Sequence, residues 1–243
     1  MMRLDKYLAE MGVGTRQEVK KQIRQGKAAV NGTVVKAADT KIDETSDEVT
    51  ICGRNISYVS YEYYMLNKPA GVVSATEDRR DTTVIDLIKE KKRKDLFPVG
   101  RLDKDTEGLL LITNDGDLAH RLLAPKKHVD KVYYAKVTGI VTEEDVERFA
   151  QGIDIGTDEE EMTRPAQLDI LKSGEESEIR LTIHEGKFHQ VKRMFQAVKK
   201  EVTYLKRERM GTLCLDEDLK PGEYRLLTEE EIENVRKYIF TDM

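Results

Sequence analysis

The chain has 243 residues, with 41 Lys or Arg, 46 Asp or Glu and a formal net charge of −5. This length suits one substantial domain together with a small one. No apolar run approaches the length that crosses a membrane, and the first residues lack the apolar core of a signal peptide. Two distant cysteines, Cys52 and Cys214, predict neither a disulfide framework nor a zinc site, so the expected compartment is the cytoplasm.

Positive charge is clustered, although the chain as a whole is acidic. Residues 1–36 carry eight Lys or Arg against three Asp or Glu, residues 89–104 carry seven against three, and residues 184–211 carry eight against three. Clustered positive charge, and not the charge of the whole chain, gives a protein its electrostatic affinity for phosphates. The clusters indicate a nucleic-acid partner, with ordinary solvated helix faces as the alternative for any single cluster.

The first 60 residues predict two short helices and a small sheet. The first helix has one apolar face, formed by Leu4, Tyr7, Leu8 and Met11. Thr15 and Glu18 form a capping box that begins the second helix, and Asn31-Gly32 predicts a tight hairpin turn. The outward positions of the second helix and its end are basic: Arg16, Lys20, Lys21, Arg24 and Lys27. This pattern is typical of a compact RNA-binding module, and a protein-binding helical hairpin is the alternative.

From residue 61 onward, strands alternate with helices. We expect strands over 61–66, 72–73 and 131–141, helices over 83–94, 117–123, 143–151, 188–200 and 229–240, and short strands with turns over 152–185 and 205–226. The predicted fold class is α+β, with a mixed, largely antiparallel central sheet. A domain boundary near residue 60 would divide the chain into residues 1–60 and 61–243.

The stretch 100–108 is a loop crowded with charge, and it runs directly into the apolar strand 109–113. A buried strand therefore anchors a polar loop, and catalytic residues are often carried by loops on rigid scaffolds. Asp103 lies between Arg101 and Lys104, and neighbouring positive charge favours the ionised form of a carboxylate. On spacing alone, a surface loop without catalytic role is the alternative.

The run GRLDKDTEGLLLITNDG at 100–116 resembles the signature of the RNA pseudouridine synthases of the RsuA and RluB/E/F group, and Asp103 falls at the family's essential aspartate. Residues 67–71, 131–133 and 185–195 are similar to further blocks of that family, in the same order. The N-terminal stretch resembles the αL RNA-binding module shared with a small-subunit ribosomal protein. The resemblance covers nearly the whole chain and implies a small αL module followed by a pseudouridine-synthase domain.

The resemblance implies an isomerisation, in which uracil leaves carbon-1′ of its ribose and is rejoined through carbon-5. Nothing is added or lost overall, so no cofactor is expected, and the four histidines show no metal spacing. Asp103 would be the catalytic carboxylate, Tyr133 would stack on the target base, and Lys192 would pair with Asp103. RNA contacts are expected from the basic N-terminal residues and from Arg101, Lys187, His189, Gln190 and Arg193.

The block 185–195 and the segments 207–211 and 221–225 look most like the RsuA branch, which modifies 16S rRNA. The expected partner is therefore 16S rRNA in assembling small-subunit particles, and the expected protein is a monomer without membrane association. A 23S rRNA pseudouridine synthase is the first alternative, since that branch typically has an R-Q-V-R core where this chain has residues 189–192. A non-catalytic RNA-binding assembly factor is the second. Asp103 and Asp105 also suggest a glycosidase-like carboxylate pair, although their spacing does not establish converging carboxyl groups.

Overall fold

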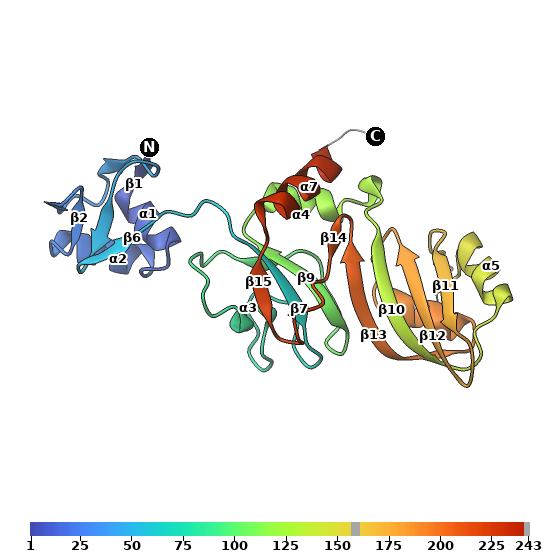
Figure 1. Cartoon of the computed structure of the whole chain (residues 1–243). Helices are drawn as coiled ribbons and strands as arrows, with labels where there is room; N and C mark the ends of the chain where they lie inside the picture. The colour runs from blue at the N-terminus through green and yellow to red at the C-terminus, as the bar shows by residue number, and fades with distance from the viewer. Residues whose placement is uncertain (157–160, 241–243) are drawn as a thin grey trace. The chain divides into compact units, whose positions relative to one another are not determined.

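The computed structural model describes residues 1–156 and 161–240, and it divides into two compact units (Figure 1). Unit 1 comprises Met1–Glu62 and Lys89–Leu96, and unit 2 comprises Tyr63–Ile88 and the described chain from Phe97 onward. The single domain boundary predicted near residue 60 does not describe these two units fully, because the segment Lys89–Leu96 also belongs to unit 1. The amino-acid composition of a segment does not show that it packs against an earlier part of the chain.

Unit 1 packs two helices against small antiparallel sheets. Its elements are β1 (Met2–Arg3), α1 (Leu4–Glu10), α2 (Arg16–Arg24), β2 (Ala28–Val30), β3 (Thr33–Val35), β4 (Lys41–Ile42), β5 (Val49–Ile51) and β6 (Arg54–Ile56). The strand order is β3-β2-β5-β6, and β1 pairs with β4. The capping box of Thr15 and Glu18 begins α2 as predicted, and Asn31 and Gly32 adopt positive φ in the β2–β3 turn. The predicted apolar face of α1 packs in the core, together with Val19 and Ile23 of α2.

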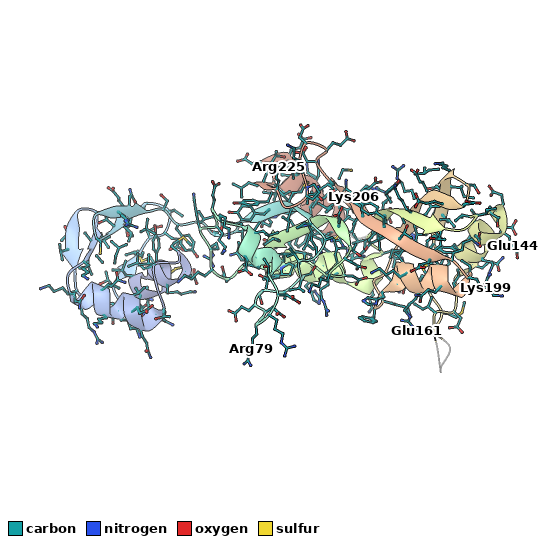
Figure 2. All side chains as sticks on the ribbon, turned by 90° about the horizontal axis from the view of Figure 1, so that it is seen from below. Arg79, Glu144, Glu161, Lys199, Lys206 and Arg225 are labelled. Atoms are coloured by element: carbon teal, nitrogen blue, oxygen red, sulfur yellow. The ribbon has the colours of Figure 1, made fainter. Side chains whose placement is uncertain are left out.

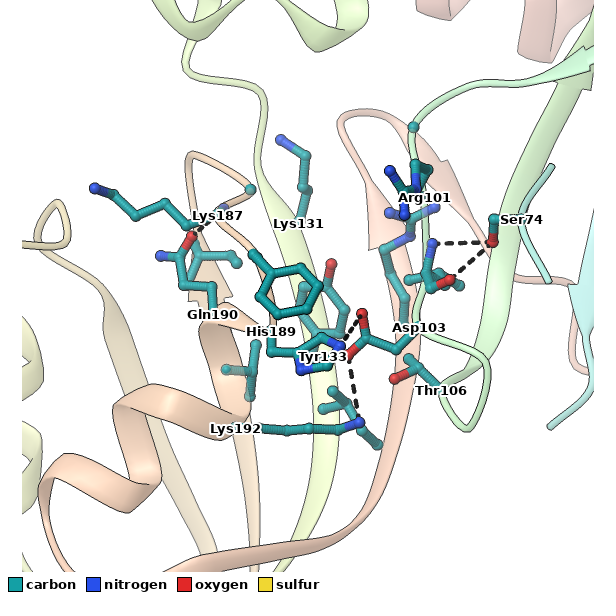
Figure 3. Close-up of a pocket in the computed structure, with 18 of the residues that line it drawn as sticks. Ser74, Arg101, Asp103, Thr106, Lys131, Tyr133, Lys187, His189, Gln190 and Lys192 are labelled. Atoms are coloured by element: carbon teal, nitrogen blue, oxygen red, sulfur yellow. Dashed lines mark hydrogen bonds and ion pairs between the residues drawn. The ribbon is translucent and has the colours of Figure 1, made fainter. Parts of the chain in front are cut away.

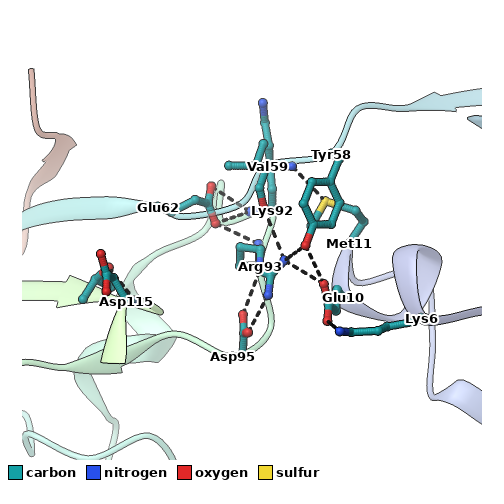
Figure 4. Close-up of polar contacts among 11 residues, drawn as sticks. Lys6, Glu10, Met11, Tyr58, Val59, Glu62, Lys92, Arg93, Asp95 and Asp115 are labelled. Carbon is teal, nitrogen blue, oxygen red and sulfur yellow. Dashed lines mark hydrogen bonds and ion pairs between the residues drawn. The ribbon is translucent and has the colours of Figure 1, made fainter. Parts of the chain in front are cut away.

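The segment Lys89–Leu96 is held in unit 1 by Arg93, whose side chain is 5% exposed (Figure 4). The Arg93 guanidinium pairs with Asp95 at 2.6 Å and with Glu10 of α1 at 3.2 Å. The backbone N–H of Arg93 donates to the carboxylate of Glu62 at 2.7 Å. A buried cation with two acidic partners thus ties the segment to α1.

Two predicted elements near this segment are wrong. The helix expected over 83–94 is only α3 (Val84–Leu87), because the backbone becomes extended at Ile88 (φ −80°, ψ 92°). The chain then leaves toward Glu62, and this long-range contact outweighs the helical spacing of its apolar residues. The strand expected at 72–73 is also absent as an element, since Val73 makes only an isolated bridge to Thr83.

Unit 2 is built on one nine-stranded sheet. Its strands are β7 (Tyr63–Lys68), β8 (Phe97–Pro98), β9 (Glu107–Thr113), β10 (Lys131–Thr138), β11 (Gln167–Lys172), β12 (Glu176–Ile183), β13 (Glu201–Met210), β14 (Leu213–Cys214) and β15 (Tyr224–Leu226). The order is β11-β12-β10-β13-β9-β7-β15, with β14 on β13 and β8 on β9. Among the named strand pairs of the described chain, β13 with β9 is parallel and the others are antiparallel. The predicted mixed, largely antiparallel sheet of an α+β protein is confirmed.

Helices cover both ends of this sheet. Besides α3 they are α4 (Gly116–Leu123), the 3-10 helix η1 (Pro125–Lys127), α5 (Glu143–Gln151), α6 (Gln190–Ala197) and α7 (Glu229–Phe240). Helices α4 and α7 lie together over the β9–β7–β15 end, and α5 packs beside β11 (Figure 1). Charged side chains project outward, for example Arg79 from the loop after β7 and Glu144 from α5 (Figure 2). In the described parts of the chain, no helix is long and apolar enough to cross a membrane.

The pairing of β9 with β13 is the seam of the sheet. It joins Glu107 to Lys206 and Gly108 to Arg207 in parallel register. Gly108 has a φ of +102°, and a Cβ added there would overlap the backbone of Arg207. Glycine is therefore required for the two strands to approach so closely. The seam places the loop before β9 beside the face of β10 and β13, which is where the functional site forms.

Candidate active site

A cavity of about 920 Å³ opens in unit 2 between the loop 100–106 and the loop 184–189 (Figure 3). Most of the site residues predicted from the sequence line it: Arg101, Asp103, Tyr133, Lys187, His189, Gln190 and Lys192. Its size is in the range of ligand-binding pockets. The five basic residues expected to bind RNA in the N-terminal module belong to unit 1. The structure therefore brings together, in one cavity, blocks that are far apart in the sequence.

Lys192 connects two carboxylates of the loop before β9. Its Nζ lies 3.3 Å from Oδ2 of Asp103 and 2.6 Å from Oδ1 of Asp105. Burial alone would lower the pKa of Lys192, but the hydrogen bond to Asp105 and the charges of both carboxylates raise it on balance. The hydrogen bond from Lys192 likewise lowers the pKa of Asp105. Asp103 and Asp105 therefore share an ammonium group instead of forming an isolated carboxylate pair.

The cations expected to flank Asp103 along the sequence lie differently. Lys104 pairs with Asp81 at 2.8 Å, and Arg101 is exposed on the rim of the cavity. Positive charge reaches Asp103 instead from Lys192, in the block 185–195. Nε2 of His189, in the same block, lies 3.6 Å from Oδ1 of Asp103. Among the residues that the structure describes, no group of three or more His, Cys, Asp or Glu could hold a metal ion.

Tyr133 lies in β10 on the sheet face that forms the cavity wall. Its side chain is 7% exposed and lies close to Asp103 and His189 (Figure 3). The register places Tyr133 opposite Arg207 of β13. The aromatic ring is thus fixed by the sheet, while the carboxylate is carried by a loop that meets the sheet at the seam.

Lys68, at the end of β7, holds the loop that carries Asp103 through hydrogen bonds to its backbone. The Lys68 ammonium is completely buried, and it donates at 2.8–3.2 Å to three backbone carbonyl oxygens, those of Pro69, Lys104 and Thr106. Burial lowers the pKa of Lys68 to about 8, although nearby carboxylates oppose the shift. On the other side, the hydroxyl of Ser74 donates to the carbonyl of Leu102 and accepts from its N–H. The sequence patterns did not identify Lys68 or Ser74 as site residues.

Two buried cations, Lys131 and Arg207, also line the cavity. Lys131 precedes Tyr133 by two residues on β10, so both share one face of the strand, and Arg207 lies opposite Tyr133. Burial and the charge of Arg207 lower the pKa of Lys131 to about 8. Arg207 donates through Nε to the carbonyl of Leu109, whereas its buried Nη2 has no hydrogen-bond partner among the described residues. The sequence patterns did not assign a role to either side chain.

Two of the residues expected to contact RNA also make contacts within the protein. Gln190 is 4% exposed; its Oε1 accepts from the Lys187 N–H at 2.8 Å, and its Nε2 donates to Glu185 at 3.1 Å. Arg193 pairs with Glu161 at 2.7 Å and also donates to a backbone carbonyl. These contacts hold the loop before α6. Gln190 and Arg193 therefore position the loop, and Lys187, which also pairs with Glu161 at 3.4 Å, lines the cavity together with His189.

Residues 62–197 match the family model described as RNA pseudouridylate synthase, and residues 2–49 match the S4 domain. The chain therefore belongs to the RNA pseudouridine synthase family, whose members are isomerases, and its N-terminal module is an S4 domain.

Relatives with this architecture match over nearly their whole length. The chain is 49% identical over 233 residues to the uncharacterized RNA pseudouridine synthase YtzG of Bacillus subtilis, covering 95% of this chain and 97% of that one. It is 44% identical over 236 residues to the ribosomal small subunit pseudouridine synthase A of Vibrio cholerae, covering 97% and 100%. A crystal structure of a pseudouridylate synthase matches with a TM-score of 0.67 and 39% identity, covering 97% and 100%.

Proposed function

We propose that this protein converts one uridine of ribosomal RNA to pseudouridine, with Asp103 as the catalytic carboxylate. The observation that carries the proposal is the contact of 3.3 Å between Asp103 and the Lys192 ammonium, in a cavity that Tyr133 also lines. A nearby ammonium favours the ionised form of a carboxylate, which the reaction requires. Asp103, Tyr133 and Lys192 together argue against a non-catalytic RNA-binding factor.

The reaction divides into tasks that these residues can perform. The bond from nitrogen-1 of uracil to carbon-1′ breaks, the base turns, carbon-5 bonds to carbon-1′, and the proton on carbon-5 is lost while nitrogen-1 gains one. Extruding the base costs a few kcal/mol of unstacking. Stacking on Tyr133 would return about 1–3 kcal/mol of that cost. Asp103 would act on the sugar or on the base, and Tyr133, which lines the same cavity, would assist the proton transfer at carbon-5.

The RNA that we propose is 16S rRNA, with its uridine 516 as the target. Support comes from the relatives named ribosomal small subunit pseudouridine synthase A, which match over the whole chain, and from the block at 189–192. An S4 domain and a separate catalytic cavity can require two RNA features at once, a docking structure and a reachable uridine. An assembling small-subunit particle offers both, whereas a mature subunit can bury the uridine. The protein would act there as a cytoplasmic monomer without a cofactor.

The test is direct mapping. Purified protein is incubated with 16S rRNA, 23S rRNA and small-subunit assembly intermediates, and carbodiimide-resistant adducts are then located by primer extension. We expect one new stop in 16S rRNA, strongest in the assembly intermediates. A stop in 23S rRNA alone would move the substrate to the other branch of the family. Absence of new stops in all three would contradict the proposed activity and favour a non-catalytic assembly factor.

A further inference from the structure

Phe188 is 71% exposed at the active-site cavity, although large apolar side chains are usually buried. Its ring stacks on the imidazole of His189, with the ring centroids 3.8 Å apart and an interplanar angle of 19°. Figure 3 shows His189 beside Asp103, within the cavity. His189 covers part of the Phe188 ring, and the large exposed fraction leaves the rest of the ring open to a ligand.

The loop holds Phe188 in this exposed position. Arg193 donates to the carbonyl of Phe188 at 3.3 Å. The N–H of Gln190 donates to the carbonyl of Lys187, and the Lys187 N–H donates back to the Gln190 side chain. His189 adopts a left-handed φ of +48°, a conformation that few residues other than glycine take readily. The exposed ring is therefore the product of a braced loop and not of a loose one.

The stack leads from the catalytic carboxylate outward. Nε2 of His189 lies 3.6 Å from Oδ1 of Asp103, and the ring of Phe188 is stacked on the His189 imidazole. A uridine that enters the cavity leaves its neighbours in the RNA outside, and each neighbour next to the gap has lost a stacking partner. An aromatic ring can replace that partner for any base, because every base has a π-face. Positive charge on the same cavity, from Arg101 and Lys187, suits the phosphates of such an RNA.

We infer that Phe188 stacks on the nucleobase adjacent to the target uridine and stabilises the RNA while that uridine is extruded. The inference rests on the proposed function, because it requires an RNA substrate whose base enters this cavity. One face of the Phe188 ring would stack on a nucleobase of the substrate strand, and the ring of His189 stacks on Phe188 within the protein.

Kinetics with two substitutions separate stacking from simple apolar contact. Phe188→Leu keeps an apolar side chain without an aromatic face, and Phe188→Trp keeps the aromatic face. We expect kcat/KM on 16S rRNA to fall roughly 5- to 100-fold in the Leu variant, mainly through KM, and to be restored by Trp, because of the free energy of base–aromatic stacking. The matched control is Phe240→Leu, since Phe240 is a 45% exposed phenylalanine of α7 outside the cavity lining.

A fluorescent probe reports the contact itself. A short RNA with one uridine flanked by 2-aminopurine should remain quenched when the wild-type protein binds it, and should become brighter with Phe188→Leu. Wild-type kcat/KM and unchanged fluorescence in the Leu variant would overturn the inference. So would equal losses in the Leu and Trp variants without a change in fluorescence, since that result indicates a structural role. If wild-type protein forms no pseudouridine in any rRNA, the proposed function fails separately, and the fluorescence still tests the stacking.

Discussion

The two units of this protein differ in how they compensate buried charge, and in unit 1 the buried groups Asp5 and Arg93 are paired with opposite charge. The carboxylate of Asp5 is completely buried and lies 3.0 Å from Arg3, 3.4 Å from Arg16 and 3.7 Å from Lys20. Burial opposes ionisation, but the hydrogen bonds from Arg3 and Arg16 lower the pKa of Asp5 on balance. The cations themselves are partly exposed, so Asp5 orders a basic surface without burying positive charge.

Unit 2 instead buries cations whose described hydrogen-bond partners are not carboxylates. Lys68 and Arg207 are 0% and 2% exposed, and Lys131 is 9% exposed. Their described hydrogen bonds are to backbone carbonyl oxygens, which carry no full negative charge. Burial of a charge costs free energy unless it is paired. Lys131 and Arg207 line the cavity, and Lys68 holds the loop that carries Asp103.

The difference predicts a division of roles between exposed and buried cations. An ordered surface of exposed cations suits phosphates that arrive from solution, and it costs the fold little. Buried cations reduce stability, so their retention at the cavity indicates a function that offsets the cost. The comparison predicts that substitution of the buried cations of unit 2 changes catalysis or stability, whereas substitution of the exposed cations of unit 1 changes RNA affinity.

The largest effect is expected from Asp103→Asn, which preserves size and removes charge. It should abolish pseudouridine formation while the affinity for rRNA stays near that of the wild type, because the basic surface of unit 1 is untouched. Single-turnover assays and filter binding measure the two quantities. An appreciable rate in the variant would contradict the assignment of Asp103, and a large loss of affinity would contradict the separation of roles between the units.

Lys192→Met should reduce the rate by roughly 10²- to 10³-fold, since it removes a preorganised charge from the site. The acidic limb of the pH–rate profile should move to higher pH, because removal of a cation disfavours an ionised carboxylate. Lys192 lowers the folded-state pKa of Asp105, so their mutual stabilisation is present above the unfolded pKa and is lost as the pH falls through the folded value. The variant's unfolding free energy should therefore vary less with acidic pH. Lys192→Arg is the charge-conserving control, and an unchanged profile in Lys192→Met would reduce Lys192 to a surface residue.

Lys131→Met should raise the free energy of unfolding while lowering catalytic efficiency. A shift of the Lys131 pKa from 10.5 to about 8 corresponds to about 3 kcal/mol as an upper limit for the gain at neutral pH. Between about pH 8 and 10 the unfolded chain holds a proton that folded Lys131 has released, so wild-type stability rises with pH there.

Chemical denaturation across that pH range should show a smaller rise in Lys131→Met. Lys68, whose pKa is also about 8, keeps its own contribution in both proteins. A lower free energy of unfolding in Lys131→Met would show that the buried charge of Lys131 is stabilised by its surroundings. That result would weaken the contrast between the buried cations of unit 2 and the paired charges of unit 1.

The smallest effect on chemistry is expected from neutralising the exposed basic residues of α2 and its end, with Lys21, Arg24 and Lys27 changed to Gln. RNA affinity should fall, and the slope of log affinity against log salt should decrease by about 0.7–0.9 for each RNA phosphate that the variant no longer neutralises. The rate at saturating RNA should be unchanged. Lys172→Gln on β11 is the control, since Lys172 is 68% exposed in unit 2. An unaltered salt slope in the triple variant would remove the RNA-binding role from this surface.

Substitution is a better test here than truncation at residue 60. Arg93 lies beyond such a cut and is buried against Glu10 of α1. Deleting residues 1–60 would remove that acidic partner from a buried cation, so altered RNA binding could reflect damage to the remaining chain.

Elements with strong local signals were predicted closely from the sequence. The bounds of α5 and α7 match the predicted ranges 143–151 and 229–240, because capping and apolar spacing agree there. Helix α6 is shorter than the predicted range 188–200 at both ends, where His189 and Lys199 adopt left-handed conformations. The helix over 83–94 failed because contacts to Glu62, distant in the sequence, determine the backbone after Ile88.

Site residues that belong to a recognisable sequence motif could be predicted. Residues whose role depends on how deeply they are buried could not. Asp103, Tyr133 and Lys192 meet in one cavity, as their sequence blocks indicated. Lys68 and Arg207 look in the sequence like any other basic residues. Only the strand register places Arg207 opposite Tyr133, and only the packing under the loop that carries Asp103 buries Lys68.

The seam between β9 and β13 has a consequence for folding kinetics. It pairs Glu107 with Lys206, positions separated by 99 along the chain (206 − 107), whereas β10 and β12 pair strands that follow more closely. Contacts at long separation require loop closure before they contribute stability, so they tend to form slowly. The cavity exists only once the seam has closed. We therefore expect a refolding chain to recover part of its circular dichroism before it recovers activity, so that turnover reports when the seam has closed.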